Sequence, residues 1–118
     1  MLLRLRCLVA AAVVVSGTST FAQQLTPKQQ REIRAEATAI AKAMVAEALV
    51  RACPDRFALI ASRSVAHRTL LTKGASWNPD QGSDIATQVN ELRSVGCDRA
   101  VEIYRSNPGR YSALRLSK

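Results

Sequence analysis

The first 22 residues determine how much of this chain can fold, because they have the layout of a segment that is removed. Arg4 and Arg6 precede an apolar run over residues 8–15, and small polar residues follow as far as Thr20. This order is typical of a secretory signal peptide. The apolar run of about eight residues is far shorter than the roughly 20 that a membrane-spanning helix needs. We therefore expect cleavage after Ala22; the alternative is an uncleaved helix on a membrane surface.

Export would leave residues 23–118 as a single domain without a transmembrane span, located in the periplasm or secreted. Cys7 would be lost, and Cys53 and Cys97 would remain in a compartment where disulfides persist. Two cysteines allow one pairing, and closing a loop of about 45 residues contributes roughly 4 kcal/mol in the chain-entropy model. We therefore predict a Cys53–Cys97 disulfide. The alternative is a pair of free thiols, although no Cys-x-x-Cys motif supports redox catalysis.

The most regular pattern in the mature chain is a long amphipathic helix. Thr26 is suited to cap it, Pro27 to occupy its first position, and Gln29 to complete a capping box. Apolar residues, many of them alanine, then recur on one half of the helix as far as Cys53. The charged residues fall on the other half: Lys28, Glu32, Glu36, Lys42 and Glu47.

The rest of the chain also predicts helices, separated by proline and glycine. A second helix is expected over residues 54–73, opened by Pro54 and ended before Gly74, with the main loop over residues 75–82. A third begins at Ser83 or Asp84 and ends at Gly96, and a fourth covers residues 98–106. The predicted fold is all-α, a small bundle of about four helices stapled by one disulfide, with a short basic tail at residues 110–118.

The residues that most enzymes need are scarce. His67 is the one histidine, and no histidine or carboxylate lies one turn away to form a helical zinc motif. The five glycines are single, so no phosphate-binding loop is present. Asp80, Asp84 and Glu91 suit turns, helix starts and a solvated face. We expect no catalysis, cofactor or metal, and keep a small envelope hydrolase using Glu91 or Asp84 as an alternative.

The basic residues are the first candidates for binding. Eleven of the fifteen cations expected in the mature chain are arginine, which pairs with carboxylate and phosphate in a two-pronged geometry. Arg56, Arg63 and Arg68 would lie on neighbouring faces of the second helix. Further arginines follow toward the C-terminus: Arg93, Arg99, Arg105, Arg110 and Arg115. Such surfaces suit an acidic protein, lipid head groups or a cell-wall polymer, whereas export and the lack of an aromatic platform disfavour nucleic acid. The alternative is that these arginines are simply solvated.

Trp77 is the other candidate. It stands in the predicted polar loop, where it could anchor a partner or fold back over the core. Together these features predict an exported, non-catalytic helical protein that binds another envelope protein as inhibitor, chaperone or assembly factor. A cationic binder of anionic envelope polymers or lipid surfaces is the alternative.

Overall fold

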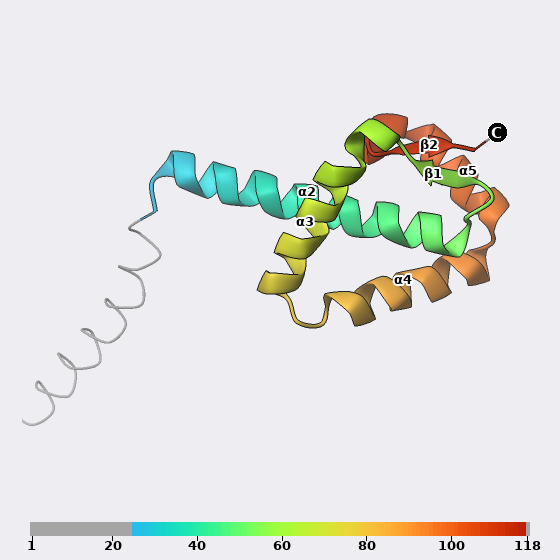
Figure 1. Cartoon of the computed structure of the whole chain (residues 1–118), viewed down its shortest axis with the longest axis horizontal. Coiled ribbons are helices and arrows are strands. Elements are labelled where there is room, and N and C mark those ends of the chain that lie inside the picture. Colours follow the sequence, from blue (N-terminus) through green and yellow to red (C-terminus); the bar gives the residue numbers. More distant parts are fainter. Residues whose placement is uncertain (1–24, 118) are drawn as a thin grey trace, which may run out of the picture. The chain divides into compact units, whose positions relative to one another are not determined.

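The computed structural model describes residues 25–117, so the predicted signal peptide lies outside the described residues. The chain divides into two compact units, and the boundary between them lies between Ala35 and Glu36. The helices are α2 (Pro27–Ala52), α3 (Ser64–Trp77), α4 (Gln81–Val95) and α5 (Cys97–Ser106), with strands β1 (Phe57–Leu59) and β2 (Leu114–Leu116) and 3-10 helices η1 (Ala61–Arg63) and η2 (Pro108–Tyr111) (Figure 1). This confirms a mostly helical fold with four helices, and adds a small two-stranded sheet.

Helix α2 begins as its sequence predicts. The Thr26 backbone N–H donates to Gln29 Oε1 (2.9 Å), and the Gln29 backbone N–H donates to Thr26 Oγ1 (3.1 Å). These are the two reciprocal bonds of a capping box. The helix ends at Ala52, next to the Cys53–Pro54 break that was expected to stop it. None of the helices within residues 25–117 is long and apolar enough to cross a membrane.

The second unit is organised around the C-terminal half of α2. Its alanine-rich surface contacts two groups of buried side chains, and α4 lies alongside it (Figure 1). The smaller group joins α2 to α4 through Ala48, Ile85 and Val89. The larger group joins α2 to β1, α5, η2 and β2: Ala46, Leu49, Cys53, Phe57, Ala100, Val101, Tyr111 and Leu114. Small side chains on α2 allow this close approach from several elements.

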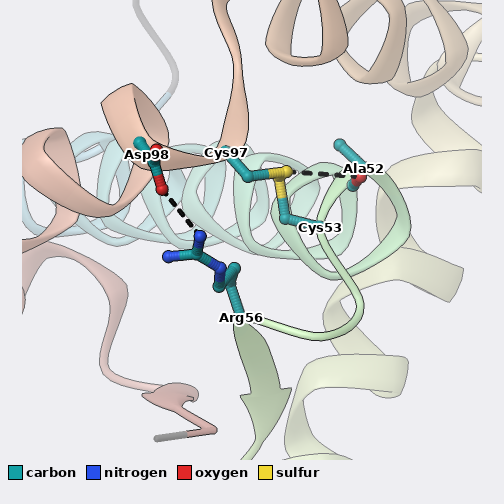
Figure 2. The surroundings of a disulfide bond; sticks show 5 residues. All are labelled: Ala52, Cys53, Arg56, Cys97 and Asp98. Carbon is teal, nitrogen blue, oxygen red and sulfur yellow. Dashed lines mark hydrogen bonds and ion pairs between the residues drawn. A yellow bond between two sulfur atoms is a disulfide. The ribbon is translucent and has the colours of Figure 1, made fainter.

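The predicted disulfide is present and lies against the larger group. Cys53, which is completely buried, is bonded to Cys97 with their Cα atoms 5.8 Å apart. The bond joins the end of α2 to the first residue of α5 (Figure 2). Beside it, Arg56 Nη2 donates to Asp98 Oδ1 (2.7 Å), so an ion pair spans the same two segments.

The predicted start of the second helix is wrong. Pro54 opens a turn, in which the N–H groups of Arg56 and Phe57 donate to the Cys53 carbonyl (3.0 and 3.1 Å), and the chain then continues as β1. Helix α3 begins only at Ser64. A proline at this position suits either a turn or a first helical turn. The outcome depends on β2, which supplies the partner for β1 and lies more than fifty residues further along the chain.

The predicted end of that helix is also wrong, because Gly74 lies inside α3. A Cβ atom at Gly74 would stand 2.6 Å from Ile40 Cγ2 and would overlap Gln81 Oε1. The glycine therefore allows close approach of α2 and the start of α4 rather than ending a helix. Helix α3 continues to Trp77, and the expected loop is reduced to the Asn78–Asp80 turn.

The expected basic tail contributes to the core. Strands β1 and β2 are antiparallel, with Phe57 opposite Leu116 and Leu59 opposite Leu114. The Phe57 ring packs edge-on against Tyr104, with centroids 5.5 Å apart, and Tyr104 Oη donates to the Leu114 carbonyl (3.2 Å). The sequence did not indicate this segment because each three-residue strand is stable only when paired.

The third and fourth helices match their predicted ends. Helix α4 ends before Gly96, whose φ of 98° belongs to the region that favours glycine, and α5 ends at Ser106, just before Asn107. The residues predicted to cap the third helix, Ser83 and Asp84, lie inside it, because α4 already begins at Gln81.

We predict that replacing both Cys53 and Cys97 by alanine lowers the free energy of unfolding by about 4 kcal/mol, since the bond closes a loop of 44 residues. Denaturant unfolding of the oxidised protein and the variant measures this, and an intact mass two hydrogens lower confirms oxidation. Reducing agent should destabilise the unmutated protein and leave the double variant unchanged. A difference below about 1 kcal/mol would contradict a stabilising role.

We also predict opposite effects at two helical glycines. Gly74→Ala should destabilise the protein by about 1 to 3 kcal/mol, because its methyl group has no space. Gly82→Ala is the matched control, because nothing lies within 4 Å of its Cβ position and alanine favours the helix by up to about 1 kcal/mol. Thermal unfolding of both variants decides the point. Equal effects would show that α3 does not approach its neighbours this closely.

Candidate functional site

The three arginines expected on one helix lie on three different elements. Arg56 precedes β1 and is paired with Asp98, Arg63 ends η1, and Arg68 lies on α3. Arg63 Nη1 donates to the Ser112 carbonyl oxygen (2.7 Å). They do not form the predicted stripe because the segment that carries them is a turn, a strand and two helices rather than one helix.

The outer face of α3 is the surface nearest to a binding groove. A shallow, open groove of about 480 Å³ lies along this helix, and its lining residues all belong to α3. We call its lining the α3 face, which consists of Val65, Arg68, Thr69, Thr72, Lys73 and Ser76. The buried His67 and Gly74 lie on the opposite side of the helix. One side of α3 is therefore fixed in the interior while the other faces solvent.

The α3 face is less polar than its residue types suggest. Thr69 Oγ1 donates to the Val65 carbonyl (2.9 Å), Thr72 Oγ1 to the Arg68 carbonyl (2.9 Å), and Ser76 Oγ to the Lys73 carbonyl (2.7 Å). Because these hydroxyl donors are satisfied within the helix, the threonines can present methyl groups to solvent. Val65 adds an aliphatic side chain, on a residue that is 69% exposed. Between the cations Arg68 and Lys73, the face therefore consists of small side chains whose hydroxyl donors are already bonded.

Trp77 lies at the C-terminal end of the same helix, next to Ser76. The residue is 54% exposed, so about half of its surface is open to a partner. Lys73, one turn earlier, forms an ion pair with Glu36 on α2, whereas Arg68 is exposed. The α3 face, with an open groove and an exposed cation, is therefore followed along the same helix by an exposed tryptophan.

A buried polar group that the sequence did not reveal lies on the inner side of α3. His67 is only 2% exposed, and its Nε2 is 2.8 Å from Glu47 Oε2 on α2. Arg51 Nε donates to the other carboxylate oxygen of Glu47 (3.0 Å). The sequence predicted Glu47 on the solvated half of its helix. It also showed no carboxylate within one helical turn of His67. The Glu47–Arg51 spacing of four residues was visible, but the contact between the two helices was not.

The surroundings of Glu47 act on its pKa in opposite directions. Burial raises the pKa, whereas the hydrogen bonds from His67 and Arg51 and the electrostatic interaction with these two side chains lower it, and the net result is a pKa below the usual value. Glu47 is therefore ionised at neutral pH. An ionised carboxylate only accepts hydrogen bonds, so His67 Nε2 carries the donated hydrogen.

The contact between Glu47 and His67 joins α2 to α3. Among the described residues, neither a nucleophile nor a set of metal ligands lies beside it. No hydroxyl or thiol of the described residues is hydrogen-bonded to His67, and its Nδ1 is buried without a partner there. No set of three histidine, cysteine or carboxylate groups in the described part of the chain could hold a metal ion. Of the other carboxylates, Asp84 Oδ2 accepts from Asn78 Nδ2 (2.9 Å), in keeping with a role in the turn.

The chain matches no protein-family model, no curated protein and no solved structure. Its function therefore has to be argued from its own residues. On that basis the α3 face with Trp77 is the strongest candidate site, since it is exposed, hollowed and low in polarity.

We predict that Glu47→Ala lowers the free energy of unfolding at pH 7 by about 2 kcal/mol, because the buried His67 donor loses its acceptor. The carboxylate has a lower pKa in the folded protein, so its stabilisation is complete above the unfolded pKa and declines as pH falls through the folded pKa. The stability difference between the protein and Glu47→Gln should therefore shrink on acidification from about pH 5.

Urea unfolding from pH 7 to pH 3 measures this difference. Glu91→Gln on α4 is the control at pH 7, where it should leave stability unchanged because the residue is exposed and its carboxylate forms no hydrogen bond or ion pair with the described residues. A Glu47→Gln difference that stays constant over the whole range would contradict the prediction.

Proposed function

We propose that this protein is an exported, non-catalytic binding module that contacts another envelope protein through the α3 face and Trp77. The observation that carries the proposal is the 54% exposure of Trp77 at the end of a low-polarity groove. Tryptophan is enriched among the residues that dominate binding energy at protein interfaces. An inhibitor, a chaperone and an assembly factor would each use such a surface.

The composition of the α3 face indicates the chemistry of the partner. Small side chains whose hydroxyl groups are already bonded let another backbone approach closely, and the methyl groups of Thr69 and Thr72 favour an apolar side chain. Arg68 is exposed at the side of the groove and suits a carboxylate. We therefore infer a protein segment with an apolar anchor next to an acidic residue.

The export half of the proposal rests on two independent features. The N-terminal segment has the order of charged, apolar and small residues found in signal peptides. The Cys53–Cys97 disulfide supports an oxidising compartment, where such bonds persist. The periplasm or the cell exterior fits both features.

We predict that a photo-reactive amino acid at position 72 cross-links one defined protein in envelope extract. Thr87 is the matched control position, because it is also an exposed helical threonine whose hydroxyl donates to its own helix (Ser83 carbonyl, 3.0 Å), but it lies on α4. Trp77→Ala should reduce cross-linking about tenfold or more while changing the free energy of unfolding by less than about 1 kcal/mol.

The cross-linked product should survive washing at high salt, since an apolar interface is little affected by ionic strength. Equal labelling from positions 72 and 87 would overturn the assignment of the α3 face. A Trp77→Ala variant that loses several kcal/mol of stability would return Trp77 to a structural role.

A further inference from the structure

Two stretches of the sequence carry cations and no carboxylate. Residues 56–79 and residues 103–118 contain arginine and lysine but neither aspartate nor glutamate. The fold brings them together, because β1 pairs with β2 and the Ile60 N–H donates to the Ala113 carbonyl (2.8 Å). Part of the positive charge of the two stretches is thereby brought to the two-stranded sheet and the 3-10 helices next to it.

Three exposed arginines lie on the elements next to this pairing, Arg63 on η1, Arg110 on η2 and Arg115 on β2, and we call them the arginine surface. The bond from Arg63 Nη1 to the Ser112 carbonyl (2.7 Å) holds its guanidinium group at a residue that lies between Arg110 and Arg115 in the sequence. Arg115 is the exposed residue of β2, between the buried Leu114 and the partly buried Leu116.

Within residues 25–117, no carboxylate is paired with the arginine surface. The ion pairs of the described chain engage the carboxylates of Glu36, Glu47, Asp98 and Glu102, and none involves these three arginines. Neighbouring positive charges repel one another, so this arrangement favours neutralisation by an external anion.

Two of the three side chains are partly ordered before any ligand binds. Arg63 is held by the Ser112 carbonyl, and the Arg110 guanidinium carbon lies 5.9 Å from the centre of the buried Tyr111 ring, within the range of a cation–π contact. Ordering in advance reduces the conformational entropy lost on binding. Each guanidinium group still has further N–H donors to offer.

The residues around the three arginines limit the kinds of ligand that the arginine surface can bind. None of the exposed large apolar side chains lies on η1, η2 or β2, the elements that carry the three arginines; those nearest in the chain are Val65 on α3 and Ile103 on α5. This disfavours both a protein interface with an apolar centre and insertion into a lipid bilayer. Tyr111 is buried and Tyr104 is partly buried, so neither offers an open platform for stacking a nucleobase. What remains is contact with charged groups alone.

We propose that the arginine surface binds a flexible polymer of phosphate groups. A phosphate offers several acceptor oxygens, so one group can accept from two adjacent guanidinium groups, and a chain of them can contact all three arginines. This site is separate from the α3 face and does not depend on the proposed protein partner.

The test is calorimetric titration of the full chain with inorganic polyphosphate between 50 and 200 mM salt. Contact with three phosphates predicts that the logarithm of the affinity falls against the logarithm of the salt concentration with a slope of about −2. Arg115→Gln and Arg110→Gln should each weaken binding several-fold and reduce the slope by about 0.7. Circular dichroism confirms that both variants are folded.

Arg93→Gln is the matched control, because Arg93 is also exposed but lies on α4, and its loss changes the net charge equally. It should retain nearly all of the affinity, as should Trp77→Ala. Equal weakening by Arg93→Gln and Arg115→Gln would overturn the proposal in favour of net charge. Tighter binding to polyglutamate, or to vesicles containing phosphatidylglycerol, would overturn the choice of ligand.

Discussion

The bond between Cys53 and Cys97 is the constraint on which the second unit depends. It fixes the end of α2 against the beginning of α5, and so determines where the chain can go on either side. On one side, the turn after Cys53 leads into β1; on the other, α5 leads through η2 into β2. The two segments that leave the disulfide therefore meet again as a pair of strands. A short sheet of this kind gains its stability from the core beneath it, where Phe57 contacts Tyr104.

Features of this fold that depend on local sequence were predictable, and features that depend on distant partners were not. The capping box at Thr26 and Gln29, the end of α4 at Gly96 and the cysteine pairing follow from neighbouring residues or from elimination. Gly74 has the local pattern of a helix end, yet its role is set by Ile40 and by the start of α4. Strand β1 likewise depends on a partner that no local pattern reveals.

The candidate sites also combine residues that the local sequence identifies with contacts that depend on distant parts of the chain. Trp77 was identified from its type and its polar neighbours, and its exposure agrees with a role as an anchor. Arg63 was also identified, but as part of one continuous helix, of which only the portion from Ser64 forms; its side chain instead contacts Ser112 in the C-terminal segment that carries Arg110 and Arg115. The Glu47–His67 contact could not be anticipated, because the two residues lie on different helices. Sequence spacing finds pairs on one helix, whereas side chains from separate elements meet only once the fold is known.

The inner side of α3 explains how its outer side can remain so weakly apolar. On the inner side, the partly buried Leu71 packs against the group formed by Ala48, Ile85 and Val89, and a glycine and a hydrogen-bonded histidine complete that side. Apolar packing of Leu71, close approach at Gly74 and the charge-assisted bond from His67 to Glu47 together hold the helix. The groove residues are therefore not required for packing, and their side chains are available for contacts outside the chain. The arginine surface has a different origin, since it exists only where β1 and β2 are paired. One small domain thus presents two chemically distinct surfaces, an open helix face followed by an exposed tryptophan and a cationic sheet edge, each created by a separate part of the fold.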